Sequence, residues 1–223
     1  VVGNNVWVDK GGSVICPVRT NCSYSSKCGI NNCMPPPIRE VLGWMYANKG
    51  YNEYITHFTG LSGHASNPEA GVSAIEYAIE YSNKLLDLKN KLKEKNKNKL
   101  FSPPYSTLQI GKISGGMGAN VIADQCSLEW EVRPVNKEDG DFINKNIEDF
   151  TKNILLPKIK KNNSKVKIKK EVIGEVIGFD RRDNSAAIDL ICNLTGDNSR
   201  ETMPFGTEAG LFQDFGISTV ICG

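Results

Sequence analysis

The stretch that decides the fold is Gly60-Leu61-Ser62-Gly63-His64-Ala65-Ser66-Asn67-Pro68-Glu69-Ala70-Gly71. Asn67 is a favourable helix N-cap, Pro68 suits the first helical position, and Glu69 favours the positive end of a helix. The stretch therefore predicts a strand, a turn built on glycines and the start of a helix. His64 would lie on that turn, either as a solvated loop residue or as a functional group.

Outward from this turn, the hydrophobic pattern alternates between the strand period and the helix period. It predicts strands at 51–59, 105–114, 126–133 and 166–172, and helices at 68–95 and 139–156, with Pro157 ending the second helix. The order βαββαβ predicts an α+β fold, a ferredoxin-like split-βαβ sheet with both helices on one face.

This unit is predicted to span residues 49–176. Residues 177–223 change in character, with helices expected at 184–195 and 207–214 and a buried strand at 217–222. We interpret them as the truncated edge of an α/β catalytic domain. The chain starts without methionine and stops directly after an apolar strand, so we expect it to be a piece of a longer protein.

Residues 1–48 form an atypical N-terminal segment, partial or foreign to the rest. Residues 3–17 resemble one coil of a left-handed β-helix acyltransferase, but such folds need several stacked coils and no further repeat follows. The cysteines of this segment lack the short C-x2-C spacing of usual zinc sites, so a metal cluster and a loop with free thiols both stay open. They are Cys16, Cys22, Cys28 and Cys33.

The composition argues against two classes of partner, nucleic acids and membranes. The formal net charge of +2 is too small to indicate a nucleic-acid partner, and the lysine-rich runs at 84–99 and 158–170 fit solvated helix ends and strand faces. No apolar run is long enough to span a membrane, and no signal peptide is visible. The chain has seven cysteines, an odd number, and the last three are scattered singly along apolar segments, which fits reduced thiols. We therefore expect a cytoplasmic protein with no nucleic-acid or membrane partner.

Three polar residues stand out on the predicted scaffold: His64, Asn120 between the second and third strands, and Arg133 near the end of the third. Histidine and asparagine can donate hydrogen bonds to an oxyanion formed at a carbonyl. Arginine can bind a carboxylate through two parallel hydrogen bonds. The alternatives are that Asn120 only forms a turn and that Arg133 only joins a cross-strand pair with the neighbours of Glu131.

Several ordered motifs closely resemble the M20 metallopeptidase family. Residues 63–75 (GHASNPEAGVSAI) resemble its G-x-x-H-S-S-x-P-x-x-G-x-N-A-I signature, and residues 113–123 and 130–134 (WEVRP) match later motifs. Residues 206–212 (GTEAGLF) resemble the G-T-E-A motif of the acetylornithine deacetylase branch. The resemblance runs from about Lys49 to the end of the chain.

This resemblance implies a two-domain, dizinc, cytoplasmic amidohydrolase that forms a homodimer through the βαββαβ domain. His64 would stabilise the oxyanion across the dimer, Asn120 and Arg133 would bind the substrate, and Gly206 and Thr207 would belong to a loop that contacts it. The implied reaction converts N-acetyl-L-ornithine and water into ornithine and acetate in arginine biosynthesis. Succinyl-diaminopimelate desuccinylases and aminoacylases share these motifs, so the acyl group and the amino acid stay open.

The chain departs from the family pattern at the metal ligands. Residues 1–50 contain no H-x-D motif, and Pro35-Pro36-Pro37 stands where the family carries an acidic ligand. The second histidine, His57, is expected to be a packed or surface residue of the first strand. We therefore expect zinc or cobalt in the full-length parent, no metal ligands in this chain and no activity of the fragment alone. The alternative is a non-catalytic dimerisation or binding module of the M20 fold.

Overall fold

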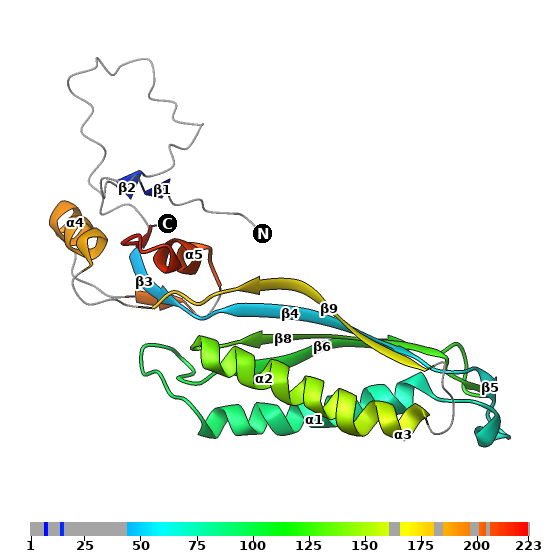
Figure 1. Ribbon diagram of the computed structural model, residues 1–223. Helices are drawn as coiled ribbons and strands as arrows, with labels where there is room; N and C mark the ends of the chain where they lie inside the picture. The colour runs from blue at the N-terminus through cyan, green and yellow to red at the C-terminus, as the bar shows by residue number, and fades with distance from the viewer. Residues whose placement is uncertain are drawn as a thin grey trace, which may run out of the picture.

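The computed structural model describes residues 7–8, 14–15, 44–160, 166–180, 185–196, 201–203 and 206–222. Two groups of elements stand out: a long sheet with helices along one face, and a smaller group at one end of that sheet (Figure 1).

The long sheet confirms the predicted α+β fold and the βαββαβ order. Its strands are β4 (Tyr51–Thr59), β6 (Thr107–Gly115), β8 (Gln125–Arg133) and β9 (Lys167–Val176), in the antiparallel order β6-β8-β4-β9. The helices α1 (Ala74–Glu94) and α2 (Lys137–Phe150) lie along one face (Figure 1). The central strand β8 buries every second residue against these helices, which is the pattern that the sequence predicts, and β4 does so along part of its length.

An aromatic cluster with one buried hydroxyl lies at the centre of this core. Tyr54 and Trp130 are directly opposite each other on β4 and β8, with ring centroids 4.4 Å apart. The indole Nε1–H of Trp130 donates to Thr56 Oγ1 at 3.0 Å, and Thr56 Oγ1 lies 3.3 Å from the hydroxyl of Tyr81 on α1. Thr56 is fully buried, so these bonds satisfy a polar group that would otherwise destabilise the core.

The predicted end of the second helix at Pro157 is wrong. After α2 the chain forms a π-helical turn, Thr151–Leu155, and continues as α3 (Leu156–Lys160). Proline has no N–H to donate, but it fits the first turn of a helix, where a donor is not needed. The π turn supplies such a restart, because the N–H of Leu156 donates to the carbonyl of Thr151. Continuing the helix stabilises the fold because it buries the side chain of Ile159 in the core.

The helix expected from residue 68 is also divided. Pro68–Ala70 form a short 3-10 turn, and α1 begins only at Ala74, with Ser73 accepting a hydrogen bond from the N–H of Glu76. Gly71 between them is extended and leaves no room for a side chain, since an added Cβ would lie 2.8 Å from the carbonyl oxygen of Leu61. The close packing of this turn against the next loop interrupts the helix.

The smaller group contains the three-stranded sheet β10-β3-β11, formed by β10 (Glu201–Met203), β3 (Trp44–Asn48) and β11 (Ile221–Cys222). It also contains α4 (Ala186–Thr195), which ends at the left-handed Gly196 as its sequence predicts, and α5 (Ala209–Asp214). Residues 44–48, placed in the N-terminal segment by sequence, thus join the C-terminal elements. The strand expected at 217–222 is limited to its last residue pair.

The two groups share a core at their junction. Trp44 and Tyr46 of β3 pack with Phe101 and Val135, which belong to loops of the βαββαβ unit. The backbones of Asn48 and Phe179 exchange hydrogen bonds of 2.7 and 2.9 Å. The two segments that connect the long sheet with the smaller group therefore lie side by side. This packing fixes the C-terminal elements against one end of the long sheet.

In the N-terminal segment, β1 (Trp7–Val8) and β2 (Val14–Ile15) pair antiparallel with each other. Successive strands of one β-helix coil do not pair in this way, so the acyltransferase resemblance is not supported. The cysteines at 16, 22, 28 and 33 lie outside the described residues. Within the described ranges, no helix combines the length and apolar character that crossing a membrane requires.

Candidate functional site

Arg133 lies at the end of β8 that faces the C-terminal elements. Its Nε–H and Nη2–H donate to the two carboxylate oxygens of Glu131 at 3.2 and 3.0 Å. Its guanidinium carbon lies 4.2 Å from the centroid of the Tyr51 ring, a cation–π contact. Glu131 is on the same strand and the same face, so the pair is not the cross-strand contact considered from sequence.

Gly206 and Thr207 lie beside this arginine cluster. A Cβ added to Gly206 would lie 2.8 Å from Tyr51 Cβ, so only glycine fits against that residue. The hydroxyl of Thr207 donates to Asn48 Oδ1 at 2.9 Å, and also accepts from the N–H of Ala209 at 3.3 Å. Gly206 is therefore packed against Tyr51, whose ring contacts Arg133, and Thr207 follows Gly206 in the chain.

His64 lies at the opposite end of the long sheet, on a small projection that we call the tip. The tip pairs β5 (Gly63–His64) with β7 (Val121–Ile122). The N–H of Ser66 donates to His64 Nδ1 at 3.2 Å, and Ser66 Oγ lies 2.7 Å from the same nitrogen. Because Nδ1 accepts from a backbone N–H, the neutral ring carries its proton on Nε2. His64 is exposed, so Nε2–H is available as a donor.

Asn120 is part of the same tip. Its carbonyl accepts a hydrogen bond from the N–H of Ala65 at 3.0 Å, and it lies in the turn that leads into β7. Asn120 thus forms the turn expected as its alternative role. Its side chain is exposed, and its backbone is bonded to Ala65, the residue after His64. The structure brings Asn120 and His64 together.

The predicted site residues therefore form two groups at opposite ends of one sheet. β8 alone runs from Gln125 near the tip to Arg133, which at about 3.4 Å per residue is about 27 Å. Figure 1 shows β5 at one end of the sheet and β3 with α5 at the other. One copy of the chain cannot bring both groups to the same substrate.

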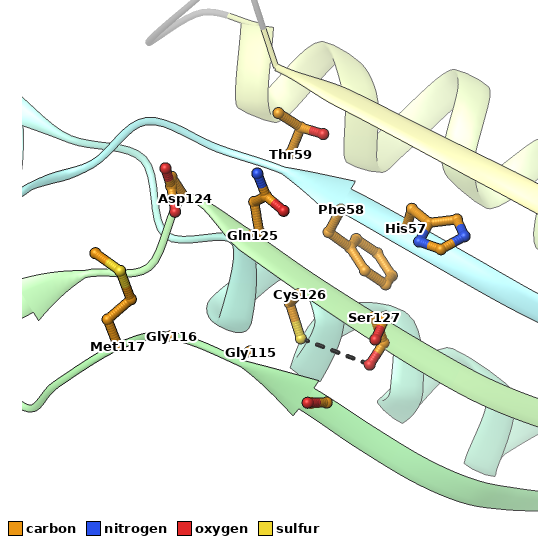
Figure 2. A pocket seen from close by; sticks show the side chains of 11 residues that line it. His57, Phe58, Thr59, Gly115, Gly116, Met117, Asp124, Gln125, Cys126 and Ser127 are labelled. Carbon is orange, nitrogen blue, oxygen red and sulfur yellow. Dashed lines mark hydrogen bonds between the residues drawn. The ribbon is translucent and has the colours of Figure 1, made fainter.

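A hollow of about 580 Å³ lies near the tip and is separate from both groups. Figure 2 shows its lining from the ends of β4 and β8 and from the loop that contains Met117. His57, on its rim, is an exposed surface residue 3.3 Å from a carboxylate oxygen of Glu171. Neither His64, Asn120 nor Arg133 lines this hollow.

A metal site is not found among the residues that the structure describes. They contain no group of three or more histidine, cysteine, aspartate or glutamate side chains that could hold a metal ion. The described part of the chain therefore does not fit the dizinc centre that the sequence resemblance implies for the full-length parent.

Sequence reasoning did not find three residues that complete these groups. Ser66 holds the imidazole of His64, and Glu131 and Tyr51 hold the guanidinium of Arg133. The available signal for Glu131 was its two-residue spacing from Arg133, which places both side chains on one side of a strand. Ser66 lies in the turn after β5, so strand spacing gives no such signal for it.

A family model described as "Peptidase dimerisation domain" (M20_dimer) matches residues 46–158. The acetylornithine deacetylase of Aliivibrio salmonicida is 33% identical over 168 residues, which are 75% of this chain and 43% of that protein. The acetylornithine deacetylase of Pectobacterium atrosepticum is 32% identical over 167 residues, 75% of this chain and 42% of that protein. The chain thus spans less than half the length of these curated relatives.

Solved structures share the fold. A tripeptidase from Staphylococcus aureus superposes with a TM-score of 0.59 at 24% identity, covering 81% of this chain and 44% of that one. The aminopeptidase PepT from Bacillus cereus gives a TM-score of 0.59 at 20% identity, covering 81% of this chain and 45% of that one. With half of its length matched by the dimerisation-domain model and three quarters aligned to the deacetylases, the chain belongs to the M20 peptidase family and is acetylornithine deacetylase-like.

Proposed function

We propose that the full-length protein is a metal-dependent amidohydrolase that converts N-acetyl-L-ornithine and water into ornithine and acetate, in the cytoplasm. The similarity to acetylornithine deacetylases supports this substrate, and the GTEA motif at Gly206 agrees with it. Succinyl-diaminopimelate desuccinylase and aminoacylase activities are the related alternatives, because they need the same kinds of contacts.

The observation that carries this proposal is the division of the polar residues between the two ends of the sheet. Arg133, Gly206 and Thr207 lie at one end, and His64 and Asn120 at the other. An N-acyl amino acid is much shorter than the roughly 27 Å length of β8. The groups can act on one substrate only if the tip of a second copy reaches the arginine end of the first.

In such a composite site, each residue has a chemical task. The guanidinium of Arg133 binds the carboxylate of the substrate, and the loop of Gly206 and Thr207 flanks it. Nε2–H of the partner copy's His64 donates a hydrogen bond to the oxygen of the acyl carbonyl, where negative charge develops during hydrolysis. Asn120 from the same tip contacts the substrate through its carboxamide. Zinc or cobalt, which activates water in such reactions, would be held by residues other than those described.

The surface proposed for the homodimer is the β6 edge of the sheet together with one flank of α1. On the opposite flank of α1, Lys84 lies over the ring of Phe150, so that flank faces the second helix. Ile79 and Leu86 lie on the β6 flank and are 48% and 44% exposed, which is high for large apolar residues. The β9 edge carries two exposed lysines, Lys167 and Lys169, which discourage pairing between edges, and β6 carries one, Lys112.

Pairing two β6 edges around a twofold axis perpendicular to the sheet would also assemble the proposed site. Strands related by such an axis run antiparallel, so the Gly115 end of one β6 lies beside the Thr107 end of the other. Thr107 is paired with Arg133 in the sheet, and Gly115 leads to the tip. The tip of each copy would therefore reach the arginine end of its partner.

The test is an assay of the full-length protein with N-acetyl-L-ornithine, after loading with zinc or cobalt. We expect hydrolysis to acetate and ornithine, and loss of most activity in His64→Ala and in Arg133→Ala. A Leu86→Glu variant should shift the dimer towards monomer in light scattering and lose activity with it. A full-length protein that dimerises but binds no stoichiometric metal and hydrolyses no N-acyl amino acid would contradict the proposal and favour a non-catalytic binding module.

A further inference from the structure

Only one edge of the Arg133 guanidinium is used inside the chain. An arginine has five N–H donors in a planar fork, and Glu131 receives one from Nε and one from Nη2. In the described part of the chain, no other hydrogen-bond acceptor is recorded for this side chain, which is 25% exposed. The edge formed by Nη1 and Nη2 can therefore donate two hydrogen bonds to a second carboxylate without breaking the first pair.

The orientation of this fork is fixed from two directions. Glu131 holds the side edge in the plane of the guanidinium, and the ring of Tyr51 covers one face at 4.2 Å. The hydroxyl of Tyr51 donates to a carboxylate oxygen of Glu53, which lies directly opposite Glu131 on the neighbouring strand. Burial and the nearby Glu53 raise the pKa of Tyr51 to about 12, so the hydroxyl keeps its proton near neutral pH.

We infer that Glu131 is a positioning residue for substrate binding. It holds one edge of Arg133 so that the opposite edge receives the carboxylate of an N-acyl amino acid, beside the loop of Gly206. This inference rests on the proposed function, because it assumes that Arg133 binds the substrate. In this arrangement an internal carboxylate fixes the guanidinium in the orientation that an external carboxylate needs.

The competing interpretation is that Glu131 opposes substrate binding, since its negative charge lies close to the incoming carboxylate. The two effects differ in their response to salt. Repulsion between partly exposed charges is screened at high ionic strength, whereas the loss of a fixed donor geometry is not. Measurements in about 0.5 M salt therefore isolate the positioning effect.

A matched control lies on the same strand. Glu129 precedes Glu131 by two residues, and its carboxylate is 39% exposed against 36% for Glu131. Glu129 pairs with Lys112 at 2.9 Å and not with Arg133. Glu129→Gln and Glu131→Gln therefore remove the same charge from the same face, but only the second replaces the two-oxygen, charged contact with Arg133 by at most one bond to a neutral amide oxygen.

The experiment measures the affinity of full-length wild type, Glu131→Gln and Glu129→Gln for L-ornithine and L-ornithinamide by titration calorimetry in 0.5 M KCl. These probes differ only in the carboxylate, and neither is hydrolysed by a deacylase. We expect wild type and Glu129→Gln to prefer ornithine by roughly ten-fold or more, as a charge-assisted bidentate pair gives. Glu131→Gln should lose most of that preference while binding ornithinamide as before, which also shows that the variant is folded.

An unchanged preference in Glu131→Gln, an increased one, an equal loss in Glu129→Gln, or a wild type without preference would each overturn the inference. Hydrolysis of N-acetyl-L-ornithine by the same wild-type sample tests the proposed function separately. An active enzyme whose Glu131→Gln variant keeps the preference contradicts only the role of Glu131. A protein that hydrolyses nothing but loses the preference in Glu131→Gln contradicts only the proposed reaction.

Discussion

Replacing Lys49 by methionine should remove a specific pH dependence of stability. Lys49 lies at the junction of the two groups of elements and is 1% exposed. Its ammonium donates to the carbonyls of Pro103 and Tyr105, both at 2.8 Å, and lies 5.8 Å from the centroid of the Phe101 ring. In the described residues no carboxylate is paired with it, and burial lowers its pKa from 10.5 to about 8.

The sign of the effect follows from this lowered pKa. Below about pH 8 the lysine is charged in both the folded and the unfolded protein, and the folded state carries the full penalty of a buried charge. Between about pH 8 and 10.5 the folded protein releases the proton first, so its stability rises with pH. With 1.36 kcal/mol per pKa unit, the rise from pH 7 to pH 9.5 is about 2 kcal/mol.

The assay is urea unfolding followed by tryptophan fluorescence at pH 7, 8, 9 and 9.5, for wild type and Lys49→Met. Other groups titrate in both proteins, so the difference between their free energies of unfolding isolates Lys49. We expect wild type to gain about 2 kcal/mol relative to the variant across this range. Lys93→Met, at an exposed position of α1, measures how much of the effect comes from removing any lysine. A difference between wild type and Lys49→Met that stays constant with pH would refute the reasoning.

Two further substitutions test the tip. Ser66→Ala removes the hydroxyl 2.7 Å from His64 Nδ1 but keeps the backbone donor, so we expect kcat of the full-length enzyme to fall by roughly 3- to 10-fold with KM nearly unchanged. Steady-state kinetics checks this, and a raised KM alone would contradict it. In Gly60→Ala the new Cβ would lie 2.0 Å from the carbonyl oxygen of Val72, so backbone must shift, and the free energy of unfolding should fall by about 2 kcal/mol or more. Urea unfolding measures this, and a loss below about 0.5 kcal/mol would show that the contact relaxes freely.

The parts of the fold that the sequence predicts well are those with one buried and one open face. The strand predicted at 51–59 coincides with β4, because alternating burial leaves a clear period. All residues of β3, Trp44–Asn48, are buried, so they show no alternation, and their partners lie far along the chain. Pro157 misled the prediction because proline ends a regular helix but not one that restarts after a π turn.

For the candidate site, the sequence predicts the backbone positions of the residues but not their side-chain contacts. Motif spacing placed Arg133 near the end of a strand, which the structure confirms. His64, expected on a turn, is the last residue of the short strand β5 and directly precedes a turn. The sequence could not show which donor edge of Arg133 is free or which nitrogen of His64 accepts from Ser66. These depend on side-chain directions, which are set by contacts with Glu131, Tyr51 and the tip backbone rather than by local sequence.

The most direct test of the central claim is complementation between two inactive variants of the full-length enzyme. His64→Ala damages the tip and Arg133→Ala damages the arginine end, so a heterodimer of the two retains one composite site with both groups intact. Co-expression with two different affinity tags isolates that heterodimer. We predict about half of the wild-type activity on N-acetyl-L-ornithine, since one of two sites is restored. A heterodimer as inactive as either parent would contradict a site shared between two copies.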